Sequence, residues 1–321
     1  MIPLSVLDLA PVVEGGDAGQ ALRRSLLLAQ HAEKLGFKRF WLAEHHGMPG
    51  VASAATAVAI GHVAGGTSRI RVGAGGIMLP NHAPLIIAEQ FGTLESLYPG
   101  RIDLGLGRAP GTDQLTSRAL RRGLSGDVDE FPRDVLELMA YFQEPGDILA
   151  VPGAGLSIPF WILGSSLYGA RLAAALGLPY AFASHFAPAQ LMQAIQLYRA
   201  EFRPSAQLDK PYVMLGVNAI AAESDEEARF LATSLEQAVV NLRTGRPGKL
   251  PPPREGLRWD FGARAMLDQF LQCAAIGSQA TVGKWLRDFI QRTGADELIV
   301  AAQLFDFDKR LRSYELVSAA C

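Results

Sequence analysis

The stretch that decides the fold is IRVGAGGIMLPNHAPLIIAEQFGTLESLYPGRIDLGL, residues 70–106. Its first part, Ile70–Gly75, is short and largely apolar, which is typical of a buried strand. Pro84–Leu97 has the length and pattern of a helix, and Arg101–Leu106 is a second short strand. Two strands joined through a helix form a β-α-β unit, in which the strands lie parallel.

The same alternation of strand and helix recurs along the chain. The pattern predicts strands at residues 3–9, 38–43, 70–75, 101–106, 159–163, 180–183, 212–221 and 297–301. Helices are predicted from about residue 17, at 52–64, 84–97, 132–142, 166–176, 188–203, 224–241, 263–275 and 279–293, and from residue 308. Eight such units in 321 residues favour an α/β protein with a closed (β/α)8 TIM barrel over an open sheet. We expect a single domain over residues 1–321, with insertions after the fourth and seventh strands.

The bulk composition excludes several classes of partner. The chain has 30 basic and 32 acidic residues and no long run of like charge, which disfavours binding to nucleic acid or to an anionic membrane. Its apolar segments are shorter than the roughly 18 residues that a membrane helix needs. The first residues lack the pattern of a secretory signal, so we expect a cytoplasmic protein. Two cysteines do not predict a disulfide framework.

The second predicted strand ends in WLAEHHGMPG, residues 41–50, which contains Glu44, His45 and His46. Active-site residues of a TIM barrel lie at the carboxyl ends of the strands, so this run is a candidate site. It is compatible with a metal site, with acid/base chemistry or with an ordinary polar loop. Adjacent residues of a strand point to opposite faces, and the chain has no HxH or HExxH spacing, so a metal site is the least favoured of the three.

The third and fourth strands end in glycine-rich segments. GAGGIMLP, residues 73–80, would let a flat ligand approach the backbone closely, although a tight turn explains the glycines equally well. GLGRAPG, residues 105–111, lacks the third glycine of a dinucleotide-binding motif because Pro110 occupies that position. Arg108 remains a candidate ligand for an anionic group, with a solvated surface arginine as the alternative.

The fifth strand runs into a helix through ILGSSLYGARLAA, residues 162–174. The free backbone N–H groups of a helix N-terminus, together with the hydroxyls of Ser165 and Ser166, would suit a phosphate. Either serine can instead be a simple helix cap. On the barrel's carboxyl end, one residue can serve both purposes.

Three of these blocks together resemble the bacterial luciferase-like flavin monooxygenase family. They are GFKRFWLAEHH, GAGGIMLPNHAPLIIAEQFGTLESLYPGRIDLGLGR and ILGSSLYGARLAAALGLPYAFASHF. The likeness is greatest to single-chain luciferase-like oxidoreductases of unassigned substrate. It implies a TIM barrel that binds reduced FMN from a separate flavin reductase and uses O2 to oxidise a small, apolar substrate. It also implies a homodimer formed through helices 52–64 and 84–97.

The resemblance assigns roles to particular residues. His45 corresponds to the catalytic histidine, and His46 would support it. Gly75 and Gly76 fall where the family has a non-prolyl cis peptide beside the flavin. The other residues that the resemblance assigns to cofactor binding are Arg108, Gly164, Ser165, Ser166, Leu167, Tyr168 and Gly169. No metal is implied.

The resemblance has one departure from the family pattern, and it leaves two alternative functions open. Gly107 stands where the light-emitting enzyme has a reactive cysteine, so luminescence is not expected. The superfamily also contains deazaflavin-dependent hydride-transfer oxidoreductases and flavin-binding proteins without turnover, and both stay open as alternatives. The sequence names neither the substrate nor the reductase, and the role of Glu44 is left open.

Overall fold

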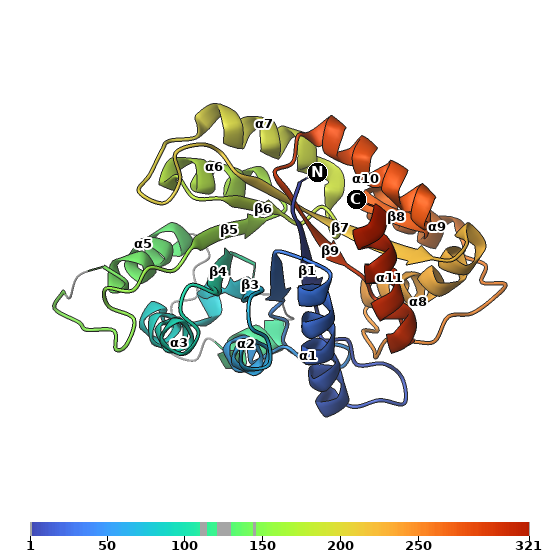
Figure 1. Cartoon of the computed structure of the whole chain (residues 1–321), viewed down its shortest axis with the longest axis horizontal. Helices are drawn as coiled ribbons and strands as arrows, with labels where there is room; N and C mark the ends of the chain where they lie inside the picture. Colours follow the sequence, from blue (N-terminus) through green and yellow to red (C-terminus); the bar gives the residue numbers. More distant parts are fainter. Residues whose placement is uncertain (1, 110–113, 121–129, 144–145, 321) are drawn as a thin grey trace.

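The computed structural model describes residues 2–109, 114–120, 130–143 and 146–320, and it shows parallel strands surrounded by helices (Figure 1). The strands are β1 (Leu4–Asp8), β2 (Arg39–Leu42), β3 (Arg71–Met78), β4 (Ile102–Gly107), β5 (Phe160–Gly164), β6 (Tyr180–Phe182), β7 (Val213–Ala222), β8 (Ala274–Ser278) and β9 (Glu297–Ala301). The helices are α1 (Ala18–Lys34), α2 (Thr56–Gly65), α3 (Pro84–Leu97), α4 (Gln114–Leu120), α5 (Phe131–Tyr141), α6 (Leu167–Leu176), α7 (Leu191–Glu201), α8 (Asp225–Arg243), α9 (Phe261–Phe270), α10 (Gln279–Thr293) and α11 (Phe307–Ala320). Within these ranges, none of the helices is both long and apolar enough to cross a membrane.

Eight of the strands close a barrel. β1 to β6 pair in sequence order, β7 pairs with both β6 and β9, and β9 returns to β1. Every one of these pairings is parallel, as expected when each strand is followed by a helix. The predicted (β/α)8 barrel is therefore confirmed, as are the insertions after the fourth and seventh strands. Residues 110–113 and 121–129 of the first insertion, Pro110 among them, lie outside the described ranges.

The strand β8 corrects the prediction of a helix over residues 263–275. That helix ends at Phe270, and Ala274–Ser278 pairs instead with Asn218–Ala222 of β7. The short strand β6 pairs only with the first residues of β7, up to Leu215. The rest of β7 would keep unpaired backbone groups without β8, and this tertiary requirement overrides the helix propensity of the alanines.

Local sequence sets most helix boundaries. Asp17 caps α1 and Ser224 caps α8, each through a side-chain oxygen that accepts a backbone N–H of the first turn. α6 and α10 end at glycines with positive φ, Gly177 and Gly294. The predicted helix at 52–64 begins only at Thr56, because the preceding segment forms a loop in which Ser53 Oγ donates to the carbonyl of Ala43.

Large side chains fill the middle of the barrel. Leu7, Trp41, Trp161, Met214 and Ile299 form a buried interior cluster, in which the two indole rings meet edge to face at 5.1 Å. The alternate residues of the same strands point outward and pack against the helices in the main core. The centre of the barrel is thus a packed layer and not a channel.

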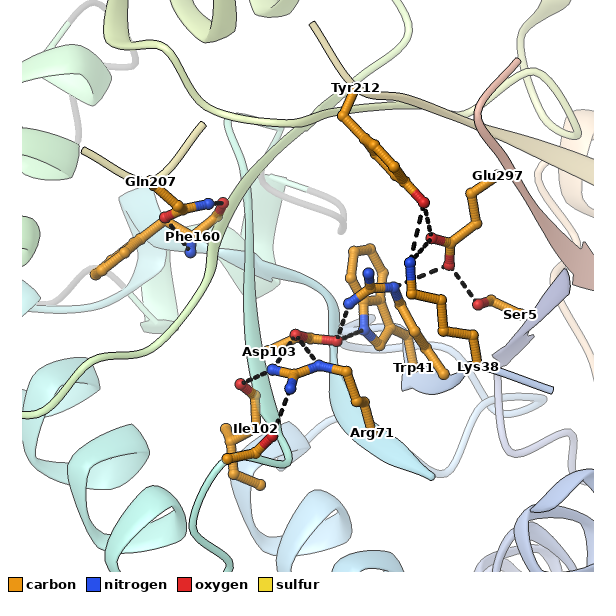
Figure 2. A network of polar contacts seen from close by, with 12 residues as sticks. Ser5, Lys38, Trp41, Arg71, Ile102, Asp103, Phe160, Gln207, Tyr212 and Glu297 are labelled. Carbon is orange, nitrogen blue, oxygen red and sulfur yellow. Dashed lines mark hydrogen bonds and ion pairs between the residues drawn. The ribbon is translucent and has the colours of Figure 1, made fainter. Parts of the chain in front are cut away.

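A polar network closes the end of the barrel where the strands begin (Figure 2). Arg39 donates from Nε to Glu297 Oε1 at 2.9 Å and from Nη1 to Asp103 Oδ2 at 2.8 Å. Trp41 Nε1 also donates to Asp103, and the Tyr212 hydroxyl donates to Glu297. Burial opposes the charge of Arg39, but the two carboxylates outweigh it and raise the pKa of the guanidinium. The strand ends that carry the candidate site lie at the opposite end.

Candidate functional site

The predicted site residues all lie at the carboxyl ends of β2 to β5, four neighbouring strands of the barrel. His45 and His46 follow β2, Gly75 and Gly76 lie within β3, Arg108 follows β4, and Gly164 ends β5. Ser165 and Ser166 lie between β5 and α6, and Leu167, Tyr168 and Gly169 form the first turn of α6. One arc of the barrel mouth thus carries the whole set.

Glu44 is the centre of the polar contacts after β2. Its Oε1 accepts from His46 Nε2 at 2.7 Å and from His82 Nε2 at 2.9 Å, and its Oε2 accepts from the Met78 backbone N at 3.2 Å. Burial alone would raise the pKa of Glu44, but the two imidazoles outweigh it and lower that pKa to about 2. An ionised carboxylate therefore holds both rings and ties the end of β2 to the end of β3.

The same three side chains meet the geometric requirement for a metal site. The ligand atoms of Glu44, His46 and His82 lie within 4.8 Å of one another. In the structure, however, both imidazoles are hydrogen-bonded to a single oxygen of Glu44, an arrangement that satisfies the carboxylate without an ion. The expectation that the site holds no metal stays a prediction. The sequence analysis missed His82, although its place shortly after β3 follows the strand-end rule.

His45 differs from His46 in its surroundings. Trp41 and Ala43 lie in the barrel interior, and by alternation His45 continues that inward face. Its Nδ1 is shielded from solvent and has no hydrogen-bond partner among the described residues. Burial lowers the pKa of His45, the charge of His46 adds to this, and Glu44 opposes it. His45 is therefore a neutral imidazole at pH 7 with an uncommitted ring nitrogen.

The peptide bond between Gly75 and Gly76 is cis, as the resemblance implied. A Cβ at Gly75 would lie 2.6 Å from Leu7 Cδ1, and one at Gly76 would lie 2.8 Å from the carbonyl oxygen of Gly105. The pairing of β3 with β4 shifts register in this segment, between Ala74 and Ile77. A side chain at Gly76 would collide with the backbone of β4, and one at Gly75 would require Leu7 to move, so β3 presents bare backbone at this level of the barrel.

The N-terminus of α6 has the features of an anion site. Ser166 is its cap residue, but its side chain makes no capping hydrogen bond. The Arg108 guanidinium stacks over the Tyr168 ring, with Cζ 4.0 Å from the ring centroid. Gly169, in the first turn of the helix, lies close to Gly164: a Cβ at Gly169 would be in van der Waals contact with the Gly164 Cα, at 3.6 Å. Backbone N–H groups, two serines and a permanent cation thus gather where a phosphate would be stabilised.

Direct contacts assemble the predicted residues into two groups. His46 belongs with Glu44 at the ends of β2 and β3, while Arg108 belongs with Tyr168 at the ends of β4 and β5. His45 shares the strand end of the first group, but the hydrogen bonds of Glu44 go to His46 and His82 and not to His45. The bare backbone of β3 lies between the two groups in strand order.

Comparisons with known proteins show which family the chain resembles over its length. The family model described as "Luciferase-like monooxygenase" matches residues 2–297. A "Luciferase-like monooxygenase" of Escherichia coli (strain K12) is 55% identical over 320 residues, which cover 98% of this chain and 96% of the relative. An "N-acetyl-S-alkylcysteine monooxygenase" of Bacillus subtilis (strain 168) is 34% identical over 331 residues, with 100% and 98% coverage.

Solved structures show the same fold. The crystal structure of apo-MsnO8 superposes with a TM-score of 0.90 at 35% identity, covering 100% of this chain and 98% of that one. The oxygenating constituent of 3,6-diketocamphane monooxygenase from Pseudomonas putida, solved in complex with FMN, has a TM-score of 0.73 at 17% identity, with 99% and 96% coverage. The second likeness is one of fold alone.

Proposed function

Because the chain belongs to the luciferase-like monooxygenase family, we propose that it uses reduced FMN and O2 to oxidise a small, apolar organic substrate. The proposal rests on one observation: features that suit the parts of a flavin follow one another at the carboxyl ends of neighbouring strands. Bare backbone at Gly75 and Gly76 suits a flat ring, and the uncapped N-terminus of α6 suits a phosphate. A solved protein of the same fold is a complex with FMN.

The residues present fit FMN. Gly75 and Gly76 would pack against the ring system, because a side chain at either position would collide with the barrel. Ser165, Ser166 and the N–H groups of Leu167, Tyr168 and Gly169 would bind the phosphate, and Arg108 would balance its charge. Reduced FMN supplies the electrons that activate oxygen. Supply of reduced FMN by a separate flavin reductase belongs to the same proposal.

His45 would act as the hydrogen-bonding and proton-transfer group of the site. Its neutral ring can donate or accept at Nδ1, which no protein group occupies among the described residues. His46 would act indirectly, because its ring is held by Glu44. The apolar layer of Trp41, Trp161 and Met214 below the site would keep water away from the reacting atoms.

We expect His45→Ala to separate cofactor binding from catalysis. The affinity for reduced FMN should stay within about threefold, since the variant keeps the ring and phosphate contacts, while substrate oxidation should fall by about 10²-fold or more. FMN binding is measured by anaerobic titration, and oxidation by product analysis. The matched control is His31→Gln. It alters a histidine of α1 that pairs with Glu315 of α11. Unchanged turnover of His45→Ala would contradict the assignment.

The first experiment compares reduced FMN with reduced deazaflavin and follows oxygen consumption. The substrate panel contains aldehydes, sulfonates, cyclic ketones and thioethers, the last because the Bacillus relative is named for an S-alkylcysteine substrate. Substrate-dependent oxygen consumption with FMN supports the proposal. Hydride transfer with deazaflavin alone would favour the deazaflavin-dependent oxidoreductase, and tight FMN binding without turnover would favour a non-catalytic flavin-binding protein.

A further inference from the structure

Arg243, the last residue of α8, lies against the turn that follows β6. We propose that Arg243 binds a carboxylate at one end of the substrate, so that the substrate is a small organic anion whose apolar part extends toward His45. The inference rests on the proposed function, because it names the substrate class of that same site. It is carried by the place of Phe186 at the barrel mouth, by the stacking of Arg243 on this ring and by the charge of the segment that follows α8.

Phe186 lies at the rim of the barrel mouth. It belongs to the turn directly after β6, and the carboxyl ends of barrel strands form the mouth. The residue before it, His185, packs on β7, where a Cβ added at Gly216 would be 2.2 Å from His185 Nδ1. Gly216 faces the same side of β7 as Met214 of the interior cluster, so its lack of a side chain makes room for this imidazole inside the barrel. Asn218 Nδ2 donates to the His185 carbonyl at 2.7 Å and thereby attaches the turn to the inner wall.

Two aromatic rings form the surroundings of the Arg243 guanidinium. Its Cζ lies 5.0 Å from the centroid of the Phe186 ring, which is 44% exposed. Phe270, the last residue of α9, meets Phe186 edge to face at 6.5 Å. Within the described ranges, the side chain of Arg243 makes no salt bridge and no hydrogen bond. A guanidinium held over a ring keeps the N–H donors at its edge free, so Arg243 can donate to a planar anion.

The segment after Arg243 adds positive charge beside the mouth. Residues 243–250 run from the turn after β6 to the loop after β1, where the backbone N of Leu250 donates to the Val12 carbonyl at 2.9 Å. Arg243, Arg246 and Lys249 are exposed, and the chain has no acidic residue between positions 236 and 255. This segment therefore favours an anion over a neutral or cationic group.

The phosphate of FMN does not account for Arg243. The proposed phosphate site has an arginine of its own, Arg108, which stacks over Tyr168 beside β4 and β5. FMN carries a single phosphate, so a second stacked arginine beside β6 is left for another anion. A carboxylate fits the planar fork of an arginine through two parallel hydrogen bonds. The rings of Phe186 and Phe270 offer apolar contact to the rest of the same molecule.

The test compares two probes of similar shape, cyclohexanecarboxylate and its neutral analogue cyclohexanecarboxamide, by calorimetric titration of the FMN-loaded protein. We expect the carboxylate to bind at least about fivefold more tightly than the amide. In Arg243→Gln, the affinity for the carboxylate should fall by about fivefold or more, and the affinity for the amide should change by less than about twofold. No measurable binding of the carboxylate, equal affinities for the two probes, or an unchanged preference in Arg243→Gln would overturn the proposal.

Arg264→Gln is the matched control, because it removes the same charge from an exposed arginine of α9 in the same insertion. It should leave both affinities within about twofold. An equal loss of carboxylate affinity in the two variants would mean that only net charge matters, and a loss of FMN affinity in Arg243→Gln would assign the arginine to the cofactor; either result overturns the proposal. If the parent protein does not bind FMN, the proposed function fails, and the same titrations without flavin decide the role of Arg243.

Discussion

Glu44 shows how a single side chain organises this site. The sequence places it beside two histidines but does not say which of them it contacts. The structure pairs it with His46 and with His82, a residue 38 positions away, and leaves His45 out of the contact. Glu44 thereby holds two imidazole rings in place, which is the role of a positioning residue.

We expect Glu44→Gln to destabilise the protein in a pH-dependent way. At pH 7 the variant loses charge-assisted hydrogen bonds, and the free energy of unfolding should fall by roughly 1.5–3 kcal/mol. The folded pKa of Glu44, about 2, lies below its ordinary value of 4.5, so its stabilisation is complete above the unfolded pKa. The difference between parent and variant should shrink as pH falls from 4.5 toward 2.

Urea unfolding over a pH series measures this difference. Glu315→Gln, which removes a half-exposed partner of His31, is the control and should change the stability by less than about 1 kcal/mol. A difference for Glu44→Gln that stays constant across the acid range would contradict the hydrogen-bonded, ionised state.

At the scale of elements, the helix N-termini fall into two kinds. α8 and α10 begin at Ser224 and Ser278, whose side chains accept a backbone N–H of the first turn. α6 begins at Ser166, whose side chain does not. The same residue type at the same position therefore stabilises two helices locally and is available to a ligand in the third.

This contrast predicts opposite results for two matched substitutions. Ser166→Ala should leave the free energy of unfolding within about 0.5 kcal/mol, because no cap is lost, but should weaken FMN binding by about threefold to tenfold. Ser224→Ala should cost about 1 kcal/mol and leave FMN binding unchanged. Chemical unfolding and flavin titration of both variants check this, and a stability loss without a binding loss in Ser166→Ala would argue for an ordinary cap.

At the scale of the whole molecule, the barrel has two different ends. The end where the strands begin is closed by buried charges (Figure 2). The end where they finish carries Gly164, His45 and His46. In TIM barrels generally, the first of these ends serves stability and the second carries the active site.

We expect Arg39→Met to destabilise the fold strongly. It removes the buried cation between Asp103 and Glu297 and leaves them only the more exposed Arg71 and Lys38 as charge partners, which should lower the free energy of unfolding by roughly 3 kcal/mol. Arg264→Met removes an exposed pair with Asp268 and should cost less than about 1 kcal/mol. Thermal unfolding compares the two variants. Similar small losses for both would mean that the network is not a stabilising feature.

Apolar residues on two adjacent helices support the proposed homodimer. Val58 on α2 is 75% exposed, and Ile86 and Leu97 on α3 are 46% and 62% exposed. We expect Val58→Glu to shift the protein toward the monomer, because a charge replaces apolar surface at the interface. Leu136→Glu, on α5 and also exposed, is the control. Light scattering coupled to size exclusion gives the mass, and a monomeric parent protein would contradict the proposal.

The strand-end segments were predictable because each is recognised from residues that are adjacent in the chain. The apolar period located β1 to β7 and β9 to within a few residues, and the rule for barrel strand ends then selected the motifs of β2 to β5. β8 was missed because its alanines favour a helix locally, and only the unpaired length of β7 requires a strand there. The contact of His82 was missed for the same kind of reason, since its partner Glu44 lies far away in sequence.

By itself, the sequence determined the barrel, the order of its elements and the arc of the mouth that carries the candidate residues. These features follow from periodicity and from glycine positions, which act over a few residues. Only the tertiary structure decided which imidazoles Glu44 holds, that Gly216 makes room for His185, and that, within the described ranges, Nδ1 of His45 and Nδ1 of His185 lack a hydrogen-bond partner. Those outcomes depend on contacts between separate strands, which no local pattern encodes.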